Sequence, residues 1–103
     1  MSRPATIPTP QPQVSEADRA EIEHYCNDMA DYALGTALDR DQGYSRAWSL
    51  ASTHQMAAQK GVLRELPDLE RVVHAVYDAP NLSPGESSRA MYRLCVQRAH
   101  VVQ

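Results

Sequence analysis

The sequence predicts an all-α protein, a small four-helix bundle, and three observations support this prediction. Apolar residues recur at three- and four-residue spacings in four segments, which is the period of an amphipathic helix. No segment shows the strict apolar–polar alternation of a half-buried strand. Serine, glycine and proline stand where the four segments begin and end. With 103 residues, the chain has room for one domain, which we expect to span residues 15–103.

Residues 1–14 are predicted to be a disordered, proline-rich tail. Prolines at positions 4, 8, 10 and 12 prevent a helix and favour extended conformations. The tail holds only Ile7 and Val14 as larger apolar residues, so it offers little to a core.

The first helix is expected from Glu16 to Asp39, with Ser15 as its N-cap. The second is expected from Arg46 to Lys60, between Gly43 and Gly61. Trp48 is expected to supply much of the area that the second helix buries. The predicted apolar stripe of the first helix is Ile22, Tyr25, Cys26, Met29, Ala33 and Ala37. That of the second is Ala47, Leu50, Ala51, His54, Ala57 and Ala58.

Prolines delimit the last two helices. Pro67 is expected to interrupt a short apolar connection, and a third helix should follow from Asp68 to Tyr77. Ser83-Pro84-Gly85-Glu86 combines a serine cap, a proline at the first helical position and a glutamate that can complete a capping box. The fourth helix should therefore run from Pro84 to about His100. The predicted third stripe is Leu69, Val72, Val73, Val76 and Tyr77, and the fourth is Ala90, Met91, Leu94, Cys95 and Arg98.

The negative charge is concentrated in the first helix. Residues 16–41 carry eight acidic side chains against Arg19 and Arg40, a net charge of −6. This pattern suits a basic protein partner, and no basic stripe with interleaved aromatic residues points to nucleic acid. The candidate partner-binding residues are Glu16, Glu23, Asp28 and Asp31. Alternatively, these carboxylates only keep the bundle soluble or pair internally with Arg89 and Arg93.

Cys26 and Cys95 are the only cysteines, one in the first helix and one in the last. Each lies on the apolar stripe of its helix. A disulfide between them would close a loop of roughly 70 residues and stabilise the fold by about 4 kcal/mol in the chain-entropy model. Two buried free thiols would behave as small apolar residues instead. The spacing alone leaves both possibilities open.

Several residues around the turns match a pattern. They are Cys26, then Arg40-Asp41-Gln42-Gly43, Val76-Tyr77, Pro80-Asn81-Leu82-Ser83-Pro84 and finally Tyr92-Arg93-Leu94-Cys95. This order resembles small helical exported proteins of Gram-negative bacteria that pair a Cys…RDxG pattern with a later VY…P-x-x-SP…Y-x-x-C pattern. The resemblance implies a secreted or periplasmic helical domain with one disulfide, Cys26–Cys95. The family has no settled activity, so the resemblance implies no catalytic residues.

Catalytic and metal-binding patterns are absent from the sequence. Glu21-Ile22-Glu23-His24 contains one Glu-x-x-His step, but a di-iron bundle needs a second. Counting from Asp39 as a calcium loop places Tyr44 and Leu50 where Gly and Glu are required. His54 is expected to be a satisfied core histidine. The sequence therefore predicts no enzyme, no cofactor and no metal site.

The favoured hypothesis is a non-catalytic exported protein that binds another protein, such as an inhibitor or immunity-type protein. No stretch is apolar enough to span a membrane, and no leader is recognisable in the sequence. Periplasmic or secreted localisation is expected, with the cytoplasm as the alternative. The competing hypotheses are a cytoplasmic or phage-type adaptor with reduced cysteines, and a small metal-binding or enzymatic domain that uses His24 and nearby acids.

Overall fold

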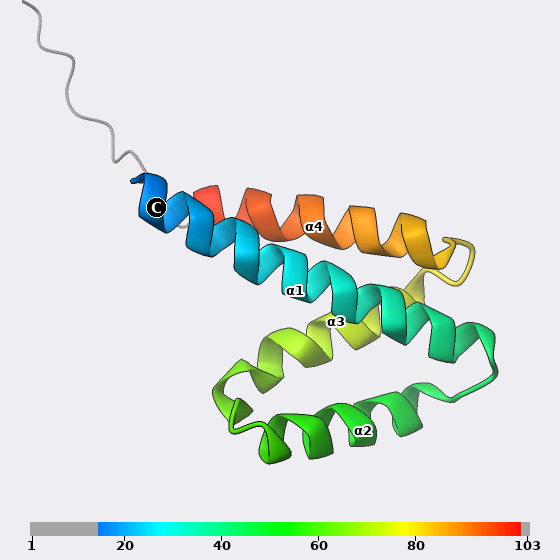
Figure 1. The fold of residues 1–103 in the computed structure, drawn as a ribbon. Helices are drawn as coiled ribbons and strands as arrows, with labels where there is room; N and C mark the ends of the chain where they lie inside the picture. Colours follow the sequence, from blue (N-terminus) through cyan, green and yellow to red (C-terminus); the bar gives the residue numbers. More distant parts are fainter. Residues whose placement is uncertain (1–14, 102–103) are drawn as a thin grey trace, which may run out of the picture.

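The computed structural model describes residues 15–101, and within them it contains helices and no strand. The helices are α1 (Glu16–Asp41), α2 (Arg46–Gln59), α3 (Leu66–Asp78) and α4 (Pro84–Val101), and a 3-10 turn spans Leu63–Glu65. The predicted all-α fold with four helices is confirmed (Figure 1). The predicted tail, residues 1–14, lies outside the described residues.

Caps set the helix boundaries largely as the sequence predicts. The Oγ of Ser15 accepts a hydrogen bond from the backbone N–H of Asp18, and that of Ser45 from Trp48, each at 3.1 Å. Gly43 and Gly61 follow α1 and α2 with φ of 97° and 70°, a region that glycine adopts without strain.

The predicted helix ends differ from the structure by one or two residues: α1 ends at Asp41, α2 ends at Gln59, and α3 begins at Leu66 and ends at Asp78. Pro67 does not interrupt the chain before α3 but lies in its first turn, because α3 begins at Leu66. A proline is tolerated there, since the N–H that it lacks would have no partner within the helix. The apolar connection before it forms the 3-10 turn Leu63–Glu65.

α1 is the central helix of the fold. α4 lies along α1 on one side, and α3 packs on another side of α1 with α2 beneath it (Figure 1). α3 and α4 make almost no direct contact. The buried cluster is Met29, Ala33, Ala37, Ala57, Leu69, Val72 and Val76, with Val73 also fully buried. Small alanines on α1 let its neighbours approach closely, whereas α3 contributes branched side chains.

The buried face of α2 differs from the predicted one. Ser49 and Thr53 are buried together with Ala57, whereas His54 is exposed and Trp48 is 44% exposed. The hydroxyls can be buried because both are hydrogen-bonded. The Oγ1 of Thr53 donates to the carbonyl of Ser49 at 2.7 Å, and the Oγ of Ser49 lies 2.8 Å from the Tyr77 hydroxyl. The predictions of a core histidine and a buried tryptophan are wrong.

A disulfide joins α1 to α4. The sulfurs of Cys26 and Cys95 are bonded, and their Cα atoms lie 5.5 Å apart, in the usual range for a disulfide. The predicted link between the first and last helices is confirmed. Among the described residues, no helix is both long and apolar enough to cross a membrane.

Candidate functional site

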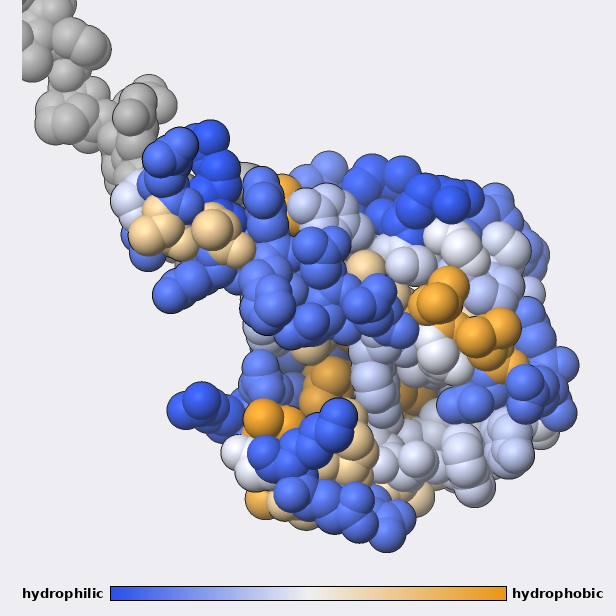
Figure 2. Space-filling view, in the orientation of Figure 1, coloured by the Kyte–Doolittle hydropathy of each residue, from blue (hydrophilic) through white to orange (hydrophobic). Residues whose placement is uncertain are grey.

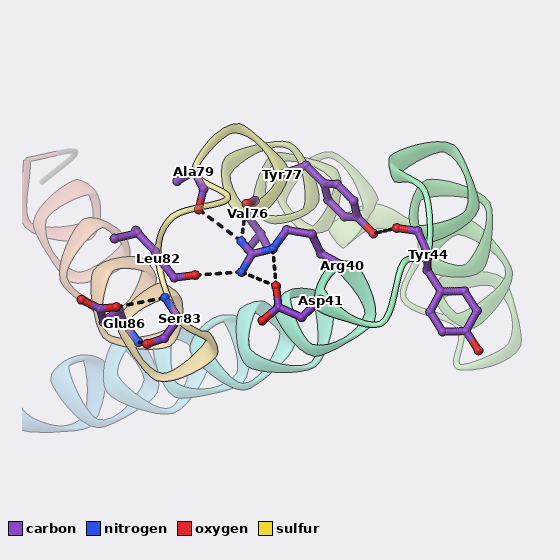
Figure 3. A network of polar contacts seen from close by, with 9 residues as sticks. All are labelled: Arg40, Asp41, Tyr44, Val76, Tyr77, Ala79, Leu82, Ser83 and Glu86. Carbon is purple, nitrogen blue, oxygen red and sulfur yellow. Dashed lines mark hydrogen bonds and ion pairs between the residues drawn. The ribbon is translucent and has the colours of Figure 1, made fainter.

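A network of polar contacts surrounds Arg40, in the last turn of α1 (Figure 3). Its side chain is only 8% exposed. One terminal nitrogen donates to the carbonyls of Val76 and Ala79 at 2.9 and 3.2 Å, and the other donates to the carbonyl of Leu82 at 2.7 Å. Asp41 pairs with the same guanidinium at 2.9 Å. The Arg40 network thus ties the end of α1 to the α3–α4 connection.

Other residues of the Cys…RDxG and VY…SP pattern also hold turns between helices. The hydroxyl of Tyr77 donates to the carbonyl of Tyr44 at 2.7 Å, which ties α3 to the α1–α2 turn. The backbone N–H of Ser83 donates to Glu86 Oε1 at 3.0 Å, and the N–H of Glu86 donates to Ser83 Oγ at 3.2 Å. These bonds complete the predicted capping box, and the one from the Ser83 backbone is the main cause that lowers the pKa of Glu86. The Arg40 guanidinium donates its hydrogen bonds to Asp41 and to the carbonyls at the end of α3 and in the turn that follows, so this cluster is architectural.

The four predicted partner-binding acids are all exposed on α1. Glu16 and Glu23 are two turns apart and share one side of the helix, whereas Asp28 and Asp31 are one turn apart on another. Asp28 lies 3.7 Å from Nε2 of His24, whose side chain is 82% exposed. Within the described residues none of the four pairs with an arginine. They form an open acidic surface that no other helix covers.

A groove with a volume of about 980 Å³ lies between α1, α3 and α4. The N-terminal half of α1 faces it, together with one side of α3 and the C-terminal half of α4. Figure 2 shows the surface hollowed between α1 and the helices drawn below it, with some hydrophobic side chains in the hollow and hydrophilic ones around it. Its apolar lining is Ile22, Tyr25, Met29, Val72, Ala75, Met91, Leu94, Ala99 and the Cys26–Cys95 disulfide.

Leu94 is the most exposed large apolar residue of the described chain, at 52%. It stands on the α4 edge of the groove. Its predicted place on the apolar stripe is correct, but no other helix covers it because α4 packs on α1 alone. Met91 is half-buried and lies deeper in the groove, where its flexible side chain can adapt its shape, and the core residue Met29 lies beneath. The groove is therefore an apolar surface that remains open.

Charged side chains surround the apolar lining. They are Asp18 and Glu21 on α1, Asp68, Arg71 and Asp78 on α3, and Arg98 on α4; the imidazole of His74 also lines the groove. On α3, Asp68 accepts a hydrogen bond from the Tyr25 hydroxyl at 2.6 Å and another from Arg71 at 3.1 Å. Burial, followed by Asp68, raises the pKa of Tyr25 far above its ordinary value. Tyr25 therefore stays protonated and anchors the edge of α3 to α1.

The acidic residues that line the groove are not the four predicted partner-binding residues. Asp18 and Glu21 face the groove, whereas Glu16, Glu23 and Asp28 do not line it. A signal for them exists in the sequence, because Asp18 precedes Ile22 by four residues and Glu21 precedes Tyr25 by four. Both acids thus extend the apolar stripe by one turn toward the N-terminus.

A second, smaller hollow of about 210 Å³ lies between α1 and α2. Asp31, Tyr32, Gly35, Trp48 and Met56 are among its lining residues. The Trp48 ring is stacked on Tyr44, with ring centroids 4.2 Å apart. Asp31 is thus the one predicted partner-binding residue that borders a hollow.

Within residues 15–99, no three His, Cys, Asp or Glu side chains are grouped so that they could hold a metal ion. Both cysteines are consumed by the disulfide, so neither offers a thiolate.

No family model matches the chain, and neither a curated protein nor a solved structure is significantly similar to it.

Proposed function

We propose that this protein is a non-catalytic, exported helical protein that acts by binding another protein. The open apolar groove between α1, α3 and α4 is the observation that carries the proposal. A groove lined mainly by apolar side chains with a few polar groups around it is the usual form of a binding site. Aliphatic and aromatic side chains next to charged ones are the usual composition of a protein interface.

The rest of the fold supports a scaffold and not a catalyst. The buried guanidinium of Arg40 is committed to backbone carbonyls, and the cysteines are committed to each other. Rigid supports of this kind preorganise a binding surface, which lowers the entropy that is lost on association.

Export is proposed from the disulfide. Such bonds persist in oxidising compartments such as the periplasm and are rare in the cytosol. The Cys26–Cys95 bond therefore favours a periplasmic or secreted protein over a cytoplasmic adaptor with reduced cysteines. The resemblance to exported helical proteins of Gram-negative bacteria suggests the same compartment. An inhibitor or immunity-type protein fits this combination of small size, rigidity and charge.

Affinity capture with the oxidised full chain tests the proposal. The bait should retain a stoichiometric partner from a Gram-negative envelope fraction. Ala75 is exposed and lines the groove, so Ala75→Trp fills the groove from α3. Ala51 is exposed on α2 and lines neither hollow, so Ala51→Trp is the matched control. We expect Ala75→Trp to lose the partner and Ala51→Trp to keep it. Equal capture by both variants, or no stoichiometric partner at all, would contradict the proposal.

The contribution of the acidic surface is tested separately. Reversing Glu23 and Asp28 to lysine should leave helicity intact and slow association with a basic partner, and the defect should shrink as salt rises. Association of the double variant at the wild-type rate in low salt would show that these acids lie outside the interface.

A further inference from the structure

We infer that the groove takes a short amphipathic helix of the partner, with an apolar face toward the disulfide and Lys or Arg side chains toward Asp18 and Glu21. This inference rests on the proposed function and specifies the occupant of the site. It follows from four properties of the groove, namely its walls, its dimensions, its lining and its charge.

The walls favour a helix over an extended strand. All three walls are α-helices, whose peptide groups are bonded within each helix. An extended segment in this apolar groove would find no backbone partners, and each unpaired buried N–H or C=O would cost free energy. A helix brings its backbone hydrogen bonds with it and needs only side-chain contacts.

The dimensions fit about three helical turns. The α1 side of the groove extends from Asp18 to Met29, which at 1.5 Å per residue is ~16 Å long. On either side of the groove, α3 and α4 each pack on α1, and they make almost no contact with each other. The space between them is where a further helix would rest on α1, as neighbouring helices do in bundles.

The lining supplies anchor positions for such a helix. Leu94 stands exposed on the α4 edge, and Met29, Met91 and Val72 lie deeper. Apolar anchors on a helix recur at three- and four-residue spacings, so two or three turns would place several of them along this surface.

The charge favours a basic partner. The groove lining carries four carboxylates and two arginines. Asp68 is already bonded to Arg71, and Asp78 to Arg46 at 2.7 Å. Within the described residues, Asp18 and Glu21 form no ion pair. After the pairs above are set aside, Arg98 is the groove arginine whose positive charge offsets theirs in part. They belong to the segment 16–41, with its net charge of −6.

Two other occupants fit less well. A second copy of this chain has a net charge of −3 and would bring its own acidic α1 toward the same carboxylates. Residues 1–14 carry prolines at positions 4, 8, 10 and 12, so they cannot enter as a helix. Both occupants are distinguished by the experiment below.

The test uses the oxidised, ¹⁵N-labelled full chain and three designed 18-residue peptides. The first carries leucines at helical spacing on one face and lysines on the other. The second replaces every lysine with glutamate, and the third places two prolines in the middle of the first. We expect the first peptide to shift the amide signals of Ile22, Ala75 and Leu94. Each of the other two should bind at least about tenfold more weakly, and the advantage over the glutamate peptide should shrink as salt rises.

Variants of the chain locate the binding site. Ala75→Trp should weaken binding of the first peptide at least about tenfold, and Ala51→Trp should leave it unchanged. Asp18→Asn with Glu21→Gln should weaken binding by about three- to tenfold, whereas Glu16→Gln with Glu23→Gln should have a smaller effect.

Several results would overturn the inference. Equal binding of the proline peptide would show an extended occupant, and equal binding of the glutamate peptide would remove the charge argument. Concentration-dependent shifts of the same signals without peptide would assign the groove to a second copy, and shifts that disappear on deletion of residues 1–14 would assign it to that segment. If no peptide binds while capture still depends on Ala75, the helix assignment fails and the proposed protein binding stands. If capture also does not depend on Ala75, both fail.

Discussion

Replacing Arg40 with alanine tests whether the motif around it is architectural. The substitution removes three hydrogen bonds to backbone carbonyls, those of Val76, Ala79 and Leu82, and the exposed hydrogen bond from Nε to Asp41. The first two carbonyls keep backbone donors, from the N–H of Ala79 and of Leu82 at 3.3 and 3.1 Å. The carbonyl of Leu82 loses the donor that lies closest to it. Stability should therefore fall by less than the sum of three charged hydrogen bonds.

The expected loss is about 3 kcal/mol, because a hydrogen bond to a charged group contributes roughly 1.5–3 kcal/mol and water can reach part of the vacated space. For a domain of this size, the melting temperature should fall by roughly 12–20 °C. Arg40→Lys keeps the charge but cannot span three carbonyls, so it should lose at least half as much.

Urea unfolding followed by far-ultraviolet circular dichroism, without reductant, measures this loss. Circular dichroism is preferable to tryptophan fluorescence because Trp48 is 44% exposed in the folded chain. Arg19→Ala is the control, since Arg19 is exposed on α1. A loss below about 1 kcal/mol for Arg40→Ala, or wild-type stability for Arg40→Lys, would refute the structural role of this arginine.

Four further outcomes are expected. Reduction of the Cys26–Cys95 bond should lower the free energy of unfolding by about 2–4 kcal/mol, and intact mass should show two hydrogens gained; unchanged stability would show that the bond does not constrain the unfolded chain. The pKa of Tyr25 is raised, so the stability that its hydroxyl contributes is fully present below pH ~10 and is lost as pH rises further. The stability of Tyr25→Phe should therefore decline less than that of the wild type above pH ~10, and identical alkaline stability profiles would contradict this. The pKa of Glu86 is lowered from 4.5, so the stability that its carboxylate gives the capping box is present at neutral pH and is lost as pH falls below 4.5. In Glu86→Gln, amide hydrogen exchange in the first turn of α4 should therefore depend less on acid pH than in the wild type. Deleting residues 1–14 should shift the melting temperature by less than about 5 °C, and a larger drop would show that the segment packs.

The helices were predictable because their ends carry chemical signals. Ser15, Ser45 and the Ser83–Glu86 box act through local hydrogen bonds, which require no knowledge of the rest of the fold. The buried face of α2 was not predictable in this way. Ser49 and Thr53 are buried because hydroxyls on Tyr77 and Tyr32, from other helices, satisfy them. A pattern that counts only apolar residues as buried assigns such a face wrongly.

The groove could be predicted only in part. The apolar stripe of α1 and the place of Leu94 on the stripe of α4 are properties of single helices. Whether that surface is covered depends on where α3 passes relative to α4. The sequence contains no local signal for this, because the bonds that fix it, such as Arg40 to Leu82 and Tyr25 to Asp68, connect residues more than forty positions apart. The four predicted partner-binding acids follow from charge alone, and this criterion does not distinguish Asp18 and Glu21, which line the groove.

The same long-range bonds explain how the groove stays open without a partner. The Arg40 network fixes the C-terminal ends of α1 and α3 at one end, and the Cys26–Cys95 disulfide holds α4 to α1 beside the groove. The Tyr25–Asp68 bond, at 2.6 Å, fixes the start of α3 against α1. With α3 and α4 each anchored to α1, neither can tilt across to bury Leu94 or Met91 without breaking a bond on its own side. Apolar surface that would otherwise drive collapse is thus kept available, and the free energy of covering it would contribute to binding of the proposed partner.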